Sequence, residues 1–264
     1  MCGKGGKGME PIVLFLYVYM FVLGGTCIAS FINVVIYRLP LGLNFVEGRS
    51  FCPKCHKTLK AYDMIPVFSW FLLRGKCRFC KEPISLRYPA IEFVGGVLAV
   101  LCFYRYGIDW MTLISFVFSM ILLTICMIDY DTMIIPNGLV ICCLIVAIVS
   151  VPFLDLSLMD RIIGFFIISV PLYIMNLIIP DCFGGGDIKL LAVSGLLMGG
   201  WINVLIGMFI AVLIAGIYAG YLLLTHRIDR KGHIAFGPYI CFGVFVALLY
   251  GQELFKWYLS LFGL

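Results

Sequence analysis

Four cysteines in a basic stretch of the chain have the spacing of a metal site. Cys52 and Cys55 form one C-x2-C pair, Cys77 and Cys80 form a second, and 21 residues separate the pairs. Four thiolates at this spacing can surround one zinc ion tetrahedrally, and such a site leaves no position open for a reacting water. We therefore expect a structural zinc ion rather than a catalytic one. Metal is also favoured over disulfides if the stretch faces a reducing compartment.

Three aspartates at the ends of apolar runs are candidates for catalysis. Asp129 and Asp131 end one run, and Asp187 begins another after three glycines. Ionisable groups near membrane depth are costly and usually functional. Two carboxylates brought close together cannot both ionise easily, so one serves as an acid and the other as a base, as in an aspartic protease. Because Asp129 and Asp131 are two residues apart on a helix, only one of them is expected to face Asp187.

A structural alternative exists for the same acids, which is helix capping. Aspartate is a preferred N-cap residue, and Asp187 stands where the next helix is expected to begin, with Gly184–Gly186 as the turn before it. Position alone gives capping and catalysis about equal weight. Glycines that let backbones approach a cleft favour catalysis slightly.

The composition indicates an all-α polytopic membrane protein. Of the 264 residues, 63% are hydrophobic and 12% are charged, and the mean hydropathy is +1.09. A soluble domain carries about twice that share of charge. Long apolar runs predict about eight transmembrane helices, with a small zinc-binding cytoplasmic lobe between the first two. The expected spans are residues 11–37, 89–104, 111–128, 138–153, 162–179, 188–199, 201–224 and 238–262.

The distribution of charge predicts the domains and the orientation. Residues 1–37 contain the N-terminus and first span, 38–88 the cytoplasmic zinc-binding loop, and 89–264 the remaining transmembrane helices. Ten of the 19 Lys and Arg residues lie between Arg38 and Arg87, which places this loop inside by the positive-inside rule. With eight spans, the second basic loop around Arg227, Arg230 and Lys231 also lies inside, together with Asp129 and Asp187. Anionic lipids are the expected partner of the basic residues, and nucleic acid is not.

The N-terminus has one feature of a signal peptide. Lys4 and Lys7 precede an apolar run, as in a secretory signal. The run continues to Tyr37, however, so we interpret it as a retained span. Eight spans would leave these two lysines outside, which is the weak point of the predicted orientation.

Four segments, taken together and in order, resemble the type IV prepilin peptidases, a family of bifunctional prepilin leader peptidases and N-methyltransferases. The first segment is Ser30–Pro40 and the third is Ile128–Asn137. The second runs from the cysteine pairs through the Arg87-Tyr88-Pro89 motif to Glu92, and the fourth is Gly184–Leu190. The resemblance covers nearly the whole chain.

The resemblance implies a fold, an activity and a site. Members are membrane aspartyl proteases with a G-x-G-D signature, here Gly184–Asp187. The motif match implies that Asp129 is the first catalytic aspartate of the family and Asp187 its partner, with Asp131 as a neighbour. It implies eight spans, an active site at the inner face of the bacterial cytoplasmic membrane and a zinc-binding cytoplasmic loop. The implied substrate is a prepilin or pseudopilin with a short basic leader, cleaved after a glycine. The new amine, typically on Phe, is then methylated from S-adenosylmethionine, an activity that members without the cysteine loop tend to lack.

No sequence motif identifies the residues that bind the methyl donor. The chain shows no nucleotide-binding fold with a G-x-G-x-x-G motif between a strand and a helix. The Arg74-Gly75-Lys76 segment is a candidate for contacting the donor or the substrate. Two alternative functions remain open from the residues: a proton-coupled transporter that uses the aspartates as a relay, and a scaffold whose zinc lobe docks a pilus assembly protein.

Overall fold

The computed structural model describes residues 10–44, 46, 50–52, 54–180, 182–227 and 234–263. Lys4, Lys7, Arg230 and Lys231 lie outside these ranges. The described residues form helices, with two isolated β-bridges and no longer strand. The α-helices are α1 (Pro11–Arg38), α2 (Phe68–Leu72), α3 (Arg87–Tyr106), α4 (Trp110–Thr132), α5 (Asn137–Val149), α6 (Leu158–Ile178), α7 (Gly185–Met198), α8 (Trp201–Leu224) and α9 (Gly237–Ser260). Two short 3-10 helices are Ala61–Met64 and Val151–Phe153.

The helix lengths confirm a polytopic membrane protein. Six helices among the described residues are long and apolar enough to cross a membrane: α1, α3, α4, α6, α8 and α9. Helices α5 and α7 have 13 and 14 residues. At 1.5 Å per residue each is about 20 Å long, which is shorter than a hydrocarbon core of about 30 Å. The expected spans 138–153 and 188–199 therefore correspond to α5 and α7, each of which is shorter than the six membrane-length helices.

The chain forms two compact units, residues 1–116 and 117–264, with the division inside α4. In the first unit α1 packs against α3, and small residues bring the two backbones together. A Cβ at Gly25 would lie 2.5 Å from the carbonyl oxygen of Gly95 and 2.8 Å from the Cβ of Ala99. Such small-residue contacts are how membrane helices gain close van der Waals packing. The Asn33 side chain also donates a hydrogen bond of 3.2 Å to the Tyr88 carbonyl oxygen.

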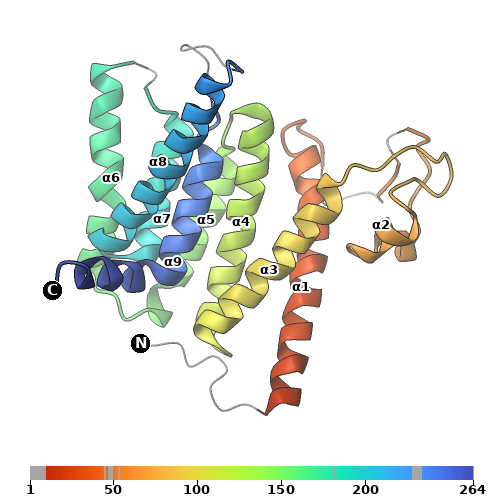
Figure 1. Cartoon of the computed structure of the whole chain (residues 1–264), viewed down its shortest axis with the longest axis horizontal. Coiled ribbons are helices and arrows are strands. Elements are labelled where there is room, and N and C mark those ends of the chain that lie inside the picture. Colours follow the sequence, from red (N-terminus) through yellow and green to blue (C-terminus); the bar gives the residue numbers. More distant parts are fainter. Residues whose placement is uncertain are drawn as a thin grey trace. The chain divides into compact units, whose positions relative to one another are not determined.

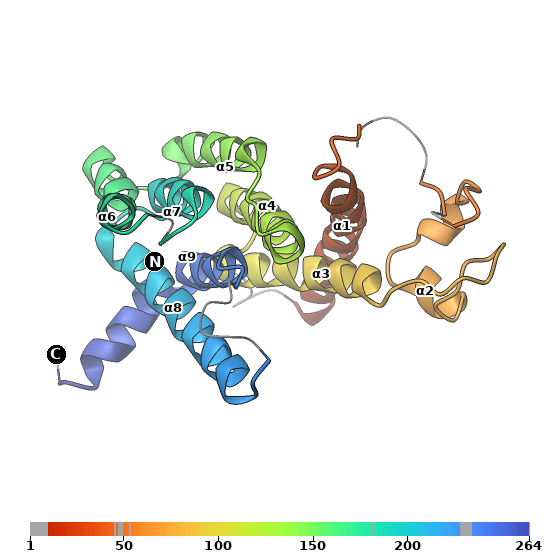
Figure 2. The ribbon, with the colours of Figure 1, turned by 90° about the horizontal axis from the view of Figure 1, so that it is seen from above.

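In the second unit, the short helix α7 is enclosed by its neighbours. It packs against α5, α6, α8 and α9 (Figures 1 and 2), and most of its side chains from Leu190 to Met198 are buried. A helix that is apolar on all sides is suited to such a position. The backbones of α6 and α7 approach most closely at Gly164 and Gly195, where a Cβ on either residue would overlap the other backbone. The first turn of α7, which contains Asp187, is thereby held inside the protein.

A buried arginine holds the opposite end of this unit. Arg161 in α6 is only 1% exposed. Its guanidinium donates to the Ser150 hydroxyl at 3.1 Å, to the Leu196 carbonyl at 3.2 Å and to the Ser150 carbonyl at 3.4 Å. Ser150 is the C-cap of α5, and Leu196 lies in the last turn of α7. A cation is favourable at these two helix C-termini, because their carbonyl groups carry partial negative charge.

Candidate active site and cysteine cluster

Asp129 lies in the last turns of α4 and is 4% exposed. Its Oδ2 atom accepts a hydrogen bond of 3.0 Å from the backbone N–H of Gly237, which is the first residue of α9. The amino end of a helix presents unpaired N–H groups and partial positive charge, so it is a favourable partner for a carboxylate. This hydrogen bond therefore connects the end of α4 to the start of α9.

Asp187 is the third residue of α7 and is 9% exposed. The N-cap of the helix is Gly184, and its backbone N–H hydrogen-bonds to the Asp187 carboxylate. This is the reciprocal half of a capping box, in which an acid at the third position satisfies the N-cap amide. Asp187 therefore contributes to the cap of α7 without occupying the N-cap position considered above.

The structure brings Asp129 and Asp187 together and leaves Asp131 outside the pair. The carboxylates of Asp129 and Asp187 interact electrostatically, and the buried Cys241 of α9 interacts with both. Asp131, two residues further along, is exposed. The different directions of two residues two apart on a helix account for this separation.

The turn between α4 and α5 packs on the start of α7. Ile135 is buried, and its Cβ lies 2.8 Å from the position that a Cβ on Gly186 would occupy. The Lys189 ammonium donates a hydrogen bond of 3.0 Å to the Asn137 side-chain oxygen. The third and fourth segments of the sequence resemblance are therefore in direct contact beside the acid pair.

Two residues near the acids were not predicted as site residues. Gly237 supplies the N–H that binds Asp129, and its sequence signal is a Gly-Pro pair at the start of the last apolar run. Asn176 in α6 binds both backbone polar groups of Phe183, at 2.8 Å each. The sequence signal for Asn176 is an amide side chain inside an apolar run. Its partner Phe183 lies in the turn after α6, and the sequence pattern does not show where that turn lies in space.

The four cysteines of the loop converge. The Sγ atoms of Cys52, Cys55, Cys77 and Cys80 all lie within 4.8 Å of one another, and those of Cys52 and Cys80 are 3.8 Å apart. A tetrahedral zinc ion with Zn–S bonds of about 2.3 Å requires sulfur atoms about 3.8 Å apart. The cluster therefore has the donor set and the size of a metal site.

Each cysteine pair lies on a turn of the same design. In the first turn the Cys52 N–H donates to the Lys57 carbonyl at 3.0 Å, and Phe51 forms a β-bridge with Thr58. In the second turn the Cys77 N–H donates to the Glu82 carbonyl at 2.8 Å. The repeated hydrogen bonding presents two thiols from each turn to a common centre.

The second turn and its surroundings stabilise the lobe. A hydrogen bond from the Cys80 backbone lowers the pKa of Cys77 to about 7, which favours the thiolate that binds metal. The buried carboxylate of Asp63 pairs with the Arg78 guanidinium at 2.6 Å and 2.8 Å. Glu92 at the start of α3 accepts a hydrogen bond of 2.7 Å from the Val67 N–H, which ties the lobe to the membrane helix.

The Arg74-Gly75-Lys76 segment, which is the candidate for contacting the methyl donor or the substrate, lies directly before the second cysteine pair. Arg74 and Lys76 are exposed, whereas Gly75 is buried with a φ of +66°. A Cβ at Gly75 would lie 2.8 Å from the ring of Trp70, whose Nε1 donates to the Ile84 carbonyl at 3.0 Å. The turn therefore presents two cations on a well-packed support.

These features define a polytopic helical membrane protein with a buried pair of carboxylates and a four-cysteine lobe. Residues 23–106 match the model of the bacterial peptidase A24 N-terminal domain, and residues 116–220 match the type IV leader peptidase family.

Curated relatives extend this similarity to nearly the full chain, and each bears the name prepilin leader peptidase/N-methyltransferase. The protein of Bacillus subtilis (strain 168) is 32% identical over 243 residues, covering 90% of this chain and 96% of the relative. The protein of Aeromonas hydrophila is 31% identical over 292 residues, covering 96% of both chains. No solved structure matches the chain. The chain belongs to the prepilin leader peptidase/N-methyltransferase family, as the resemblance of its four segments indicates.

Proposed function

We propose that this chain is a membrane aspartyl endopeptidase that removes the short basic leader of type IV prepilins or pseudopilins and N-methylates the new N-terminal residue. The observation that carries the proposal is the buried pair Asp129 and Asp187, each bound by a backbone N–H at the start of a helix. The family names supply the substrate class. The transporter alternative finds no support in them.

The arrangement suits peptide hydrolysis without a metal. Because Asp129 and Asp187 are close enough to interact, protonation of one carboxyl favours ionisation of the other. The ionised carboxylate accepts a proton from the attacking water, and the protonated carboxyl donates one to the leaving amine. The fixed N–H donors of Gly184 and Gly237 keep both acids in place without reorganisation.

The alternation of the helices in the second unit supports the proposed eight membrane crossings. The acid end holds the last turn of α4, the starts of α5, α7 and α9, and the Phe183 turn that follows α6. The opposite end holds the C-termini of α5 and α7 and the start of α6. On this proposal α5 and α7 cross with the six longer helices, and the acid end faces the cytoplasm of a bacterial inner membrane. The basic residues then meet anionic lipid head groups.

The cysteine lobe, within residues 38–88, is proposed to hold a structural zinc ion and to serve methylation. Cys52, Cys55, Cys77 and Cys80 would bind the ion, consistent with their mutual distances. S-adenosylmethionine, when bound, would supply an electrophilic methyl group to the new amine. The exposed cations of Arg74 and Lys76 are suited to the donor's carboxylate, and they are the proposed contacts. Residues 89–264 form the peptidase domain on this proposal.

Asparagine substitutions of the two acids test the peptidase proposal. Asp129→Asn or Asp187→Asn keeps the shape of the side chain but removes its acid–base chemistry, so leader removal should fall by a factor of about 10³ or more. The measurement is cleavage of a prepilin by membranes that contain equal amounts of each variant. Asp131→Asn is the matched control and should cleave normally. Processing by both acid variants at the wild-type rate would refute the proposal.

The same reaction tests methylation. Membranes are incubated with a prepilin and labelled S-adenosylmethionine, and the product's N-terminus is then sequenced. Label on the first residue after the cleavage site is the expected result. Label elsewhere, or none on a cleaved product, would contradict the second activity while leaving the first intact.

A further inference from the structure

The short helix α2 of the cysteine lobe has an exposed apolar face. Phe68, Phe71 and Leu72 are 65%, 64% and 78% exposed. They stand at positions i, i+3 and i+4 of the helix, so their side chains share one face. The helix has five residues and is too short to span a membrane. Large apolar side chains that are exposed together outside a span mark a contact surface. We call these three residues the α2 face.

The opposite side of α2 is fixed to the lobe. The Trp70 indole N–H donates to the Ile84 carbonyl at 3.0 Å, and the indole ring lies 2.8 Å from the position of a Cβ on Gly75. The Gly75 N–H donates to the Trp70 carbonyl at 2.8 Å, just after the helix ends. A rotation of α2 that buried its apolar face would break these contacts. The α2 face is therefore held pointing away from the lobe.

A strained turn sets the direction of α2. Val67, the residue before the helix, has a φ of +63° and a ψ of −54°, and the Phe68 N–H donates to the Pro66 carbonyl at 2.6 Å. This is a γ-turn with positive φ, which is rare and strained, especially for a β-branched residue. Such strain persists only where the surroundings hold it, and it is concentrated at functional sites. The Glu92 carboxylate holds the turn here, because it accepts a hydrogen bond of 2.7 Å from the Val67 N–H.

The contact with Glu92 places the α2 face at the membrane surface. Glu92 is the sixth residue of α3, which has 20 residues and is long and apolar enough to cross a membrane. At 1.5 Å per residue, α3 is about 30 Å long, which equals the hydrocarbon core, and Glu92 lies about 7.5 Å from its first residue. Figures 1 and 2 show α2 beside the start of α3. The α2 face is therefore held near the boundary between head groups and hydrocarbon.

The charge next to this face suits an anionic surface. Arg74 and Lys76 follow α2 directly, and both are exposed. Asp63 and Glu82, the acids among the described residues of the lobe, each form an ion pair within the lobe. A cationic segment beside a membrane span is attracted to anionic lipids. Apolar side chains next to the cations strengthen such binding by entering the interface.

We propose that the α2 face anchors the cysteine lobe in the membrane interface, with Phe68, Phe71 and Leu72 inserted into a bilayer that contains anionic lipids. The cations that follow α2 then lie at the level of the head groups. This inference deepens the proposed contact between the basic residues and anionic lipids, and it does not depend on the peptidase. On the proposed function, the anchor keeps the lobe beside the bilayer, where the new amine of a membrane-bound substrate is exposed.

Photocrosslinking tests the anchor. The full-length protein is made with benzoylphenylalanine in place of Phe71 and reconstituted in vesicles of phosphatidylcholine and phosphatidylglycerol. Phe79 in the second cysteine turn is the control position, because its ring is also exposed but lies beneath the Lys57 ammonium at 5.0 Å. After irradiation, residue 71 should give several-fold more lipid adduct than residue 79. Equal yields at the two positions, or adducts of residue 71 with protein alone, would overturn the inference.

Tryptophan fluorescence gives a second test. Replacing the three other tryptophans by phenylalanine leaves Trp70 as the reporter, and its ring centroid is 5.4 Å from that of Phe71. Lipids brominated near the head groups should quench this fluorescence in vesicles that contain phosphatidylglycerol. Combining Phe71→Ser with Leu72→Ser should reduce the quenching several-fold. Leu86→Ser is the matched control, since Leu86 is 66% exposed and lies outside α2, and it should leave the quenching unchanged.

The same measurement distinguishes the anchor from its alternatives. Unchanged quenching in the double variant, or equal quenching of the reporter protein in phosphatidylcholine alone, would overturn the inference. Neither experiment requires cleavage of a substrate. Failure of the peptidase proposal would therefore leave both results intact.

Discussion

Asp129 and Asp187 are positioned by two glycines that the chain places at the starts of different helices. Gly184 lies three residues before Asp187, whereas Gly237 is 108 residues from Asp129. Each provides a backbone N–H, and neither has a side chain that would occupy the space of the acid. The local partner is visible in the G-x-G-D signature, and the distant one requires the fold.

Gly237→Ala is predicted to inactivate the peptidase without changing either acid. A Cβ at this position would lie 2.6 Å from Oδ2 and 2.8 Å from Cγ of Asp129, so the carboxylate must move. A displacement of about 1 Å in a catalytic group can lower kcat/KM by a factor of about 10². Leader cleavage is measured with the variant at wild-type abundance in the membrane.

Gly138→Ala is the control for this prediction. Gly138 also lies in the first turn of a helix, and a Cβ there would have no atom within 4 Å. This variant should cleave normally. Wild-type activity in Gly237→Ala would mean that the contact with Asp129 is dispensable.

At the scale of elements, the position of the short helix α7 depends on contacts at both of its ends. The acid end is closed by the Asp187 carboxylate, and the other end by Arg161, which binds α5 and α7 together. A helix of 14 residues gains little stability alone. Its position is therefore a product of packing and of these end contacts.

Arg161→Met is predicted to destabilise the protein. The change preserves the apolar stem but removes the guanidinium donor from the Leu196 carbonyl and the Ser150 hydroxyl, at a cost of about 1–3 kcal/mol. Thermal unfolding in detergent measures the loss. Arg161→Lys keeps a cation near both helix ends and should lose less, and equal stability of Met and wild type would contradict the role.

The cysteine lobe is predicted to contain about one zinc ion per chain, lost when Cys52 and Cys77 are both replaced by serine. Metal analysis of the purified protein measures this directly. Because the lobe and the acid pair belong to different compact units, leader cleavage should persist in the variant while methylation is lost. A metal-free wild type with both activities would refute the zinc proposal.

At the scale of the whole molecule, the predicted eight crossings can be tested by reporter fusions. A reporter that is active only outside the cytoplasm should be active after Phe262 and inactive after Thr225, because α9 lies between them. The basic residues near Arg227 favour retention of that loop inside. Reporter activity after Thr225 would reverse the orientation and place the acid pair outside.

Much of the site was predictable from local pattern. The spacing of the cysteines predicts that four thiols can converge, because each pair needs only a short turn, and the sulfur atoms do converge. Apolar length predicts eight spans, and six of them correspond to helices long enough to cross a membrane among the described residues. The residues alone left Asp129 and Asp131 as alternatives, and the burial of Asp129 distinguishes them in space.

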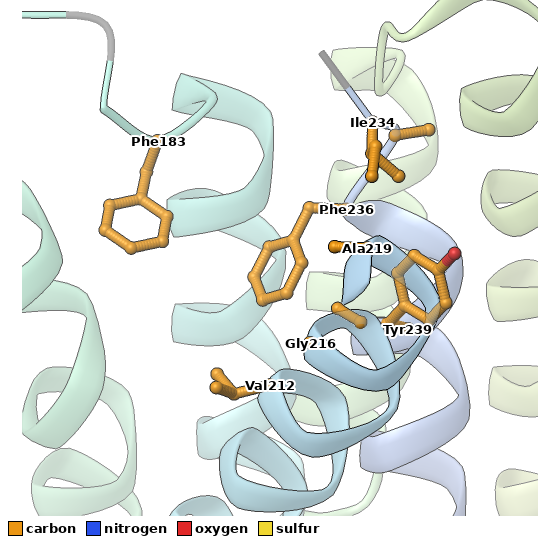
Figure 3. A pocket seen from close by; sticks show the side chains of 9 residues that line it. Phe183, Val212, Gly216, Ala219, Ile234, Phe236 and Tyr239 are labelled. Atoms are coloured by element: carbon orange, nitrogen blue, oxygen red, sulfur yellow. The ribbon is translucent and has the colours of Figure 1, made fainter. Parts of the chain in front are cut away.

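The sequence by itself determined the membrane class, the cysteine cluster and the family, since these depend on composition and on residues close together along the chain. Tertiary structure alone decided that Gly237 binds Asp129, that Asn176 holds Phe183, and that the rings of Phe183 and Phe236 are neighbours, with centroids 6.3 Å apart (Figure 3). Most of these contacts join segments that are far apart in the sequence, and hydrophobic periodicity describes each segment separately. They depend on how closely the helices pack, which is set by small residues and side-chain shape rather than by hydrophobic pattern.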